Sequence, residues 1–196
     1  EYYAKSQLVF TDFTKETFIG EPAIYRGFSL SPDAKLLLLQ TISKPFSYTV
    51  PAYDFPHSVI VTDLKGNLLR KIADNPSAEG VPIGFDDAPD YPRYFSWRND
   101  EPATITYIKA LDGGLGKSES EWRDALMAIK INADGKESPA KELFKTKMRF
   151  QDVMWGNSTT ALFFEESYAN RKFQMNRYNP ATGISDSLFA RSSNDS

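Results

Sequence analysis

The sequence has no cysteine and a single histidine among its 196 residues. Without cysteine, the chain cannot form a disulfide framework, a thiolate zinc site, a cysteine nucleophile or a redox-active pair. His57 is the one ordinary base for a Ser-His-Asp triad, and no Gly-x-Ser-x-Gly motif accompanies it. We therefore predict that the chain carries no catalytic residue and that local hydrogen bonds hold His57.

A basic surplus and a long apolar run are also lacking. The 23 lysines and arginines oppose 26 aspartates and glutamates, so the net charge is −3. Nucleic-acid-binding proteins carry a basic surface, which this balance does not predict. The longest aliphatic run, Leu36 to Leu39, is far shorter than the ~20 residues of a membrane-spanning helix. We expect neither nucleic acid nor a membrane as a partner.

Motifs for cofactors and metals are missing as well. No Gly-x-Gly-x-x-Gly or Walker sequence occurs, and Gly113-Gly114-Leu115-Gly116 is interpreted as a flexible loop. The three aspartates within residues 86–90 could ligate a hard cation such as calcium, but without EF-hand spacing a solvated acidic loop is favoured. Glu165 and Glu166 are neighbours on a predicted strand, so their side chains face opposite ways. We predict no cofactor and no metal site.

What the chain does contain is typical of strands and turns. Aromatic residues make up 14% of the sequence, and 12 prolines and 11 glycines separate many short apolar runs. Three segments share a pattern of apolar strand, tight polar turn and second apolar strand, and another hairpin follows each one. Four strands per unit, repeated in this way, are typical of a β-propeller. The three repeats contain Phe28-Ser29-Leu30, Phe95-Ser96-Trp97 and Asp152-Val153-Met154.

We predict an all-β fold, a partial β-propeller of four-stranded antiparallel blades with about three blades plus part of a preceding one. Propellers close with four to eight blades, so residues 1–196 are interpreted as a single fragment of a propeller domain. Residues 118–127 allow an alternative, a short helix in a loop. The outer strands of the preceding blade are assigned to 1–20 and the blades to 25–73, 94–146 and 150–191, with outer hairpin turns at 65–67, 133–136 and 179–183.

The long connections are expected at one end of the blades. Strand direction alternates, so short turns gather at one end, and the connections 43–57, 75–94 and 112–124 gather at the other. Loops on a rigid scaffold often carry function, although loops also lengthen where nothing opposes them. The segment 44–56 is rich in aromatic residues and proline, which favours packing on the blade, on another domain or on a ligand. Arg171-Lys172 could pair with a carboxylate or form a solvated edge.

Several motifs resemble a known family. The turn Ser31-Pro32-Asp33-Ala34-Lys35 resembles the Ser-Pro-Asp-Gly-Lys turn of TolB-like and prolyl oligopeptidase propellers. Five further motifs, in order, resemble the propeller of the glutamyl endopeptidase branch of the prolyl oligopeptidase family, whose chloroplast members cut after glutamate. The resemblance runs from about residue 7 to residue 178. The five motifs are Lys44-Pro45-Phe46-Ser47-Tyr48, Pro92-Arg93-Tyr94-Phe95-Ser96-Trp97-Arg98, Pro102-Ala103-Thr104, Ala110-Leu111-Asp112-Gly113-Gly114 and Arg123-Asp124-Ala125.

The resemblance implies a serine peptidase with an N-terminal propeller and a C-terminal α/β-hydrolase domain that carries the triad. None of the three triad positions lies in this sequence, so no catalytic residue is carried over. The implied partners are that hydrolase domain and a peptide substrate, with no cofactor, and the compartment stays open among periplasmic, secreted and organellar. A stand-alone TolB- or WD40-like propeller that binds proteins is the alternative. The candidates for contact with the hydrolase or with an acidic side chain of a substrate are Lys44, Phe46, Tyr48, Arg93 and Arg171.

Overall fold

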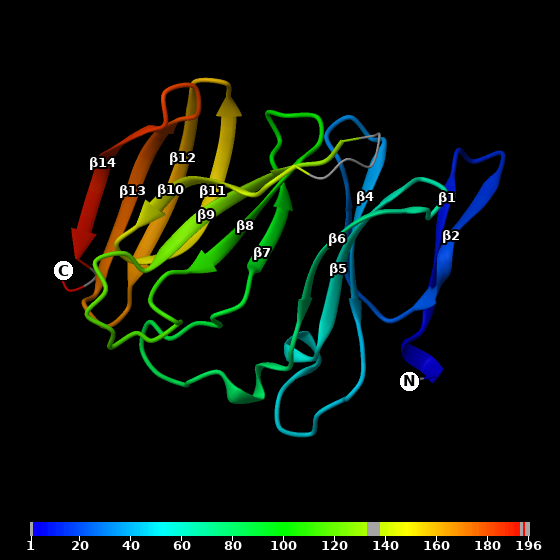
Figure 1. The fold of residues 1–196 in the computed structure, drawn as a ribbon, viewed down its shortest axis with the longest axis horizontal. Helices are drawn as coiled ribbons and strands as arrows, with labels where there is room; N and C mark the ends of the chain where they lie inside the picture. The colour runs from blue at the N-terminus through cyan, green and yellow to red at the C-terminus, as the bar shows by residue number, and fades with distance from the viewer. Residues whose placement is uncertain (1, 133–137, 193, 195–196) are drawn as a thin grey trace. The chain divides into compact units, whose positions relative to one another are not determined.

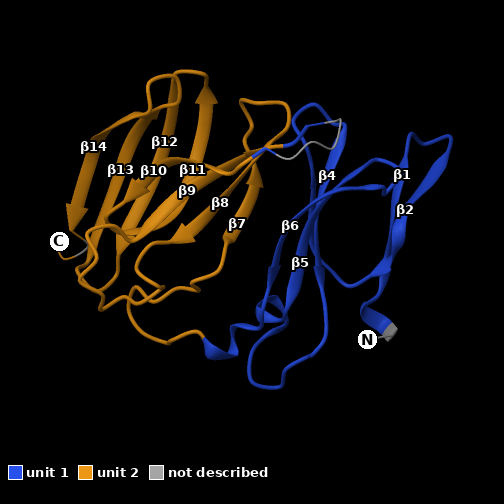
Figure 2. Cartoon of the chain, viewed as in Figure 1, with its two compact units in different colours: residues 1–80, 131–138 blue, residues 81–130, 139–196 orange. Residues whose placement is uncertain are grey.

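The computed structural model describes residues 2–132, 138–192 and 194, and confirms the all-β prediction. Its strands form one two-stranded and three four-stranded antiparallel sheets, as a partial propeller requires (Figure 1). The described residues contain short 3-10 helices but no α-helix, and thus no helix that could span a membrane. The chain divides into two compact units, each described by itself below: unit 1 is residues 1–80 with 131–138, and unit 2 is residues 81–130 with 139–196 (Figure 2).

Unit 1 contains the two-stranded sheet and one four-stranded sheet. In the four-stranded sheet, the strands pair in chain order, each with the next. The apolar core of unit 1 contains Ile19, Leu37 and Leu39, and Leu8 and Ile60 pack against these residues. The elements are η1 (Tyr2–Ala4), β1 (Ser6–Thr11), β2 (Glu16–Ala23), β3 (Tyr25–Leu30), β4 (Leu36–Ile42), η2 (Ala52–Asp54), β5 (His57–Asp63), β6 (Leu68–Asn75) and η3 (Ala78–Gly80).

Unit 2 contains the other two four-stranded sheets, which share one core. Phe144 and Phe163 stack with their ring centroids 4.1 Å apart, and Tyr178 lies 4.8 Å from Phe144. Ile108, Leu126, Phe150 and Ala161 also belong to this cluster, so both sheets contribute to it. Each large apolar side chain buried in this way contributes about 1.5–3 kcal/mol. The strands are β7 (Arg93–Trp97), β8 (Thr104–Ala110), β9 (Asp124–Lys130), β10 (Lys141–Thr146), β11 (Arg149–Asn157), β12 (Thr160–Ser167), β13 (Lys172–Asn179) and β14 (Ile184–Ser192).

The connections follow the predicted pattern. The three long ones are confirmed, because 14 residues lie between the end of β4 at Ile42 and the start of β5 at His57, and loops of comparable length precede β7 and β9. The hairpin turns at 65–67 and 179–183 are also confirmed, whereas the turn predicted at 133–136 lies outside the described residues. The alternative of a helix at 118–127 is wrong, since β9 begins at Asp124 and the preceding residues are irregular.

The turn between β3 and β4 explains one of the recognised motifs. The Ser31 hydroxyl accepts the backbone N–H of Lys35 and of Leu36 and donates to Asp33, which closes the turn. Ala34 has φ +56°, in the left-handed region that favours glycine. The resembling motif has glycine at this position for that reason.

His57 is buried at the start of β5 and held by three neighbours. Its Nδ1 lies 3.0 Å from the carbonyl oxygen of Phe55, and its Nε2 faces the guanidinium of Arg26 and, at 3.2 Å, the side-chain amide of Asn75. A neutral ring that donates from Nδ1 and accepts at Nε2 satisfies these contacts. Burial lowers the pKa of His57 below its ordinary value of 6.5, and the charge of Arg26 acts in the same direction.

This environment predicts a pH-dependent stability. The unfolded chain takes up a proton near pH 6.5 while folded His57 stays neutral to lower pH, so the free energy of unfolding falls as the pH drops below about 6.5. The slope from one proton is at most about 1.4 kcal/mol per pH unit. In urea titrations between pH 7.5 and pH 5.5, the His57→Gln variant should lack the part of the pH dependence of the unfolding free energy that comes from His57.

The comparison is specific, because the sequence has no second histidine. An unchanged difference in stability between wild type and His57→Gln across that pH range would contradict the neutral, buried state of His57.

Candidate functional site

Arg149, the first residue of β11, connects three segments of unit 2. Its Nη1 and Nη2 donate to the two carboxylate oxygens of Asp112 at 2.9 and 2.8 Å, and Nη1 also lies 3.2 Å from Asp124 Oδ1. Its Nε donates to the backbone carbonyl of Asp86 at 2.6 Å. The segments 81–92 and 111–123 are therefore fixed to the start of β11. These two segments and the turn 168–171 are called the long-loop end of unit 2.

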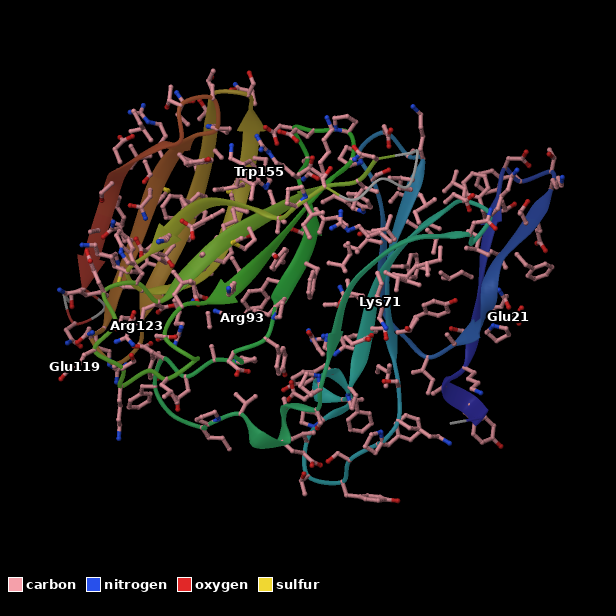
Figure 3. All side chains as sticks on the ribbon, in the orientation of Figure 1. Glu21, Lys71, Arg93, Glu119, Arg123 and Trp155 are labelled. Atoms are coloured by element: carbon pink, nitrogen blue, oxygen red, sulfur yellow. The ribbon has the colours of Figure 1, made fainter. Side chains whose placement is uncertain are left out.

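Two buried carboxylates bind the arginines at this end. The Asp124 side chain is fully buried and accepts from Arg93 Nη2 at 2.7 Å and from the backbone N–H of Phe150 at 2.9 Å. Asp112 binds Arg149 and also Arg123, whose Nη1 lies 2.9 Å from Asp112 Oδ2. Burial alone would raise the pKa of Asp112, but the hydrogen bonds from Arg149 and Arg123 lower it. Arg93 projects from β7, and Arg123 directly precedes β9 (Figure 3).

The glycine-rich segment predicted to be a flexible loop is instead packed against residues 85–88. Gly114 is buried with φ +76°, and a Cβ there would lie 2.0 Å from the carbonyl oxygen of Ala88. A Cβ at Gly116 would lie 2.1 Å from the carbonyl oxygen of Phe85. The Gly114 carbonyl accepts the N–H of Ala88 at 2.9 Å. The prediction of flexibility is wrong because the absence of side chains serves a close approach of two backbones.

The aspartates of the acidic loop also have structural partners. Asp86 accepts from the Ser167 hydroxyl at 2.8 Å and from the backbone N–H of Tyr168 at 2.7 Å, and Asp87 accepts from the N–H of Gly116 at 2.7 Å. The expectation of a solvated loop is thus wrong for these two, while Asp90 is exposed. Among the described residues, no group of acidic side chains or histidines is arranged to hold a metal ion.

A cleft of about 280 Å³ opens at the long-loop end of unit 2. It lies where β7 and β11 begin, and these are the first strands of their two sheets. Its lining includes Asp86, Asp87, Arg93, Tyr94, Arg149, Gln151, Glu166 and Tyr168.

Backbone strain gathers around this cleft. Asp86 and Tyr94 line it with φ +63° and +57°, and Arg171 beside it has φ +54°. A bulky residue such as Tyr94 rarely adopts this conformation, which costs on the order of 1–3 kcal/mol. The pairing of β7 with β8 shifts register between Arg93 and Ser96, so Tyr94 lies in a β-bulge. Bulges and strained residues are common next to binding sites, where they redirect side chains.

Arg93, predicted to contact a substrate or another domain, is only 9% exposed and is bound to Asp124. Arg171 lies close by, with its guanidinium carbon 4.8 Å from the ring centroid of Tyr168, a cleft residue. The structure therefore brings these two candidates to the same end of unit 2. Glu165 and Glu166 face opposite ways as predicted: Glu165 is buried and accepts the N–H groups of Lys147 and Met148, while Glu166 lines the cleft.

The other three candidates lie together in unit 1, in the loop between β4 and β5. The ammonium of Lys44 is 5.8 Å from the ring centroid of Phe46, and Phe46 stacks on Phe55 at 5.7 Å. Glu79 accepts from the hydroxyls of Ser47 and Thr49, which holds the loop against η3. Tyr48 is fully exposed at the tip. The loop is held by its own Phe46–Phe55 stack and by Glu79 of η3, and it presents the ring of Tyr48 to solvent.

Sequence reasoning missed Asp112, Asp124 and Arg149 as the organising residues. Asp112 and Asp124 stood within the family motifs, but nothing in the sequence showed that both would meet an arginine from a different blade. Asp124 lies at the end of the predicted connection 112–124, and Arg149 lies one residue before the predicted blade 150–191, so the sequence predicts neither as part of a strand. Charged residues are rarely buried without a partner, and these positions gave no local signal of burial.

We predict that Asp124→Asn strongly destabilises the protein. The substitution leaves Arg93 and Arg149 buried with less compensating charge, and breaking a buried pair costs about 3–5 kcal/mol. Urea unfolding measures the loss. Asp186→Asn is the matched control. The side chains of Asp186 and Arg177 are both about half exposed, so loss of their ion pair should cost under about 1 kcal/mol. Equal effects of the two substitutions would contradict the role of Asp124.

Comparison with known proteins supports the family resemblance. No protein-family model matches the chain. A probable chloroplastic glutamyl endopeptidase of Oryza sativa subsp. japonica is 35% identical over 173 residues, which are 88% of this chain and 18% of that protein. A protein of the same name from Arabidopsis thaliana is 34% identical over 200 residues, covering 100% of this chain and 20% of its own length. The chain thus spans about a fifth of the length of these curated relatives.

A solved structure supports the fold. Oligogalacturonate lyase from Vibrio parahaemolyticus is a propeller-like neighbour with a TM-score of 0.55 and 13% sequence identity. The match covers 97% of this chain and 49% of the lyase chain. At that identity the likeness concerns the fold alone. The predicted resemblance is confirmed: this chain is a partial β-propeller that is similar, along nearly all of its length, to a segment of the chloroplastic glutamyl endopeptidases.

Proposed function

We propose that this chain is the non-catalytic propeller segment of a serine peptidase of the prolyl oligopeptidase family. In this proposal, it positions peptide substrates, or gates their access, for a C-terminal α/β-hydrolase domain of the same protein. The observation that carries the proposal is similarity over 88% and 100% of the chain to proteins named as glutamyl endopeptidases. A role in chemistry is disfavoured, because the sequence has no Gly-x-Ser-x-Gly motif and its single histidine is buried among local partners.

The geometry of the long-loop end of unit 2 supports a positioning role. Its loops are fixed by buried ion pairs and by backbone contacts, so they present a preformed cleft. Preformed sites bind with a smaller entropic cost than mobile loops. In unit 1, the exposed ring of Tyr48 and the cation of Lys44 offer a second surface to a peptide or to the hydrolase domain. Cleavage after glutamate belongs to the proposal as well.

The sequence of the gene beyond the codon for Ser196 tests this function. We expect a downstream Gly-x-Ser-x-Gly motif, followed by an aspartate and a histidine that complete the triad. A reading frame without these residues would refute the peptidase assignment and favour a stand-alone propeller that binds proteins.

The isolated chain should not hydrolyse an internally quenched peptide that contains one glutamate. The readout is the fluorescence released over time, with a serine-reactive inhibitor added in parallel to reveal a contaminating peptidase. Turnover that persists in the presence of the inhibitor would show that this chain has its own chemistry and would contradict a non-catalytic role.

A further inference from the structure

The cleft at the long-loop end of unit 2 contains a buried donor without an acceptor. Arg93 lines the cleft and is over nine-tenths buried, and its Nη2 is bound to Asp124. Its Nη1 is also buried and has no hydrogen-bond partner in the part of the chain that the structure describes. A buried donor left unpaired costs about 1–3 kcal/mol, more when it is charged, so such groups call for an explanation.

The same cleft contains an acceptor that has no partner. Glu166 lines it, and its carboxylate makes no hydrogen bond or ion pair within the described residues. The neighbouring Asp86, by contrast, is occupied by the Ser167 hydroxyl and two backbone N–H groups. The cleft lining therefore includes one residue with an unpaired buried donor, Arg93 Nη1, and one residue with an unpaired acceptor, the carboxylate of Glu166.

The groups around the cleft indicate what kind of ligand would satisfy Arg93. The cleft lining and the ion network beneath it carry three cations and five carboxylates, and Arg171, Lys172 and Arg191 line an adjoining hollow that Glu166 shares. Positive and negative groups are thus nearly equal in number, and one unpaired donor beside one unpaired acceptor fits a neutral ligand that carries both kinds of group better than a simple anion. The cations are Arg93, Arg123 and Arg149, and the carboxylates are Asp86, Asp87, Asp112, Asp124 and Glu166.

We propose that this cleft binds the main chain of an extended peptide, with a backbone carbonyl accepting from Arg93 Nη1 and a backbone N–H donating to Glu166. A peptide backbone offers alternating donors and acceptors and carries no net charge, which fits this pair of groups. Tyr94 and Tyr168 are both more than 45% exposed and provide apolar walls to the cleft. This inference rests on the proposed peptide-handling function and replaces the expectation that Arg93 pairs with an acidic side chain.

Nuclear magnetic resonance tests the proposal on the ¹⁵N-labelled chain. The probes are acetyl-tetraalanine amide, which offers only main-chain groups, and acetate at the same concentrations. We expect the peptide to shift the Arg93 Nε–H resonance and the Gln151 amide in a saturable way, and acetate to shift neither. Comparable shifts with acetate would make the cleft an anion site and overturn the proposal, as would the absence of a saturable shift with the peptide.

Two variants separate binding from folding. Arg93→Lys keeps a cation for Asp124 but has no second nitrogen, so peptide affinity should fall at least about fivefold, which corresponds to about 1 kcal/mol. Glu166→Ala should weaken binding by a similar factor, whereas Glu142→Ala, on an exposed position of β10, should not. Unchanged affinity in Glu166→Ala would overturn the proposal even if Arg93→Lys failed to fold. These binding measurements require no hydrolysis. Failure of this proposal therefore shows in the binding data, whereas failure of the proposed function shows in the gene sequence beyond Ser196.

Discussion

The ion pairs of Arg149 with Asp112 and Asp124 are the interaction on which the long-loop end of unit 2 depends. Moving these three charges out of water costs several kcal/mol per ion, and only good geometry offsets that cost. Here the guanidinium uses all three of its nitrogens: two bind carboxylates, and Nε binds the carbonyl of Asp86 at 2.6 Å. Because Asp86 and Asp112 lie in the connections before β7 and β9, one side chain fixes two long loops.

The loops thereby become part of the scaffold. Loops usually move and vary more than the strands that they connect. In unit 2, the backbone contacts of Gly114 and Gly116 and the hydrogen bonds of Asp86 and Asp87 add to the ion network. The result is a cleft whose strained residues, Asp86 and Tyr94, are kept in place by their surroundings. The proposed peptide would therefore meet groups that are already oriented.

The repeat pattern was sufficient to predict the fold, because alternating apolar residues and turn residues are local signals. The hairpin at 65–67 follows from such signals. The site was predictable only in outline. The sequence indicates Arg93 and Arg171 as candidates, but the burial of Arg93 depends on Asp124, 31 positions later in the sequence. Likewise, the glycines at 113–116 look mobile until the backbone of 85–88 is known to pack against them. Contacts between distant segments have no local signature.

Hydrogen exchange in Arg149→Lys tests most directly whether the Arg149 network holds the long-loop end in place. Lysine keeps the charge but cannot reach three partners at once. We predict that the amides of Gly116 and Tyr168, which donate to Asp87 and Asp86, exchange at least about tenfold faster, whereas amides in the centre of β13 change much less. Equal acceleration at all of these amides, or none at Gly116 and Tyr168, would contradict this account.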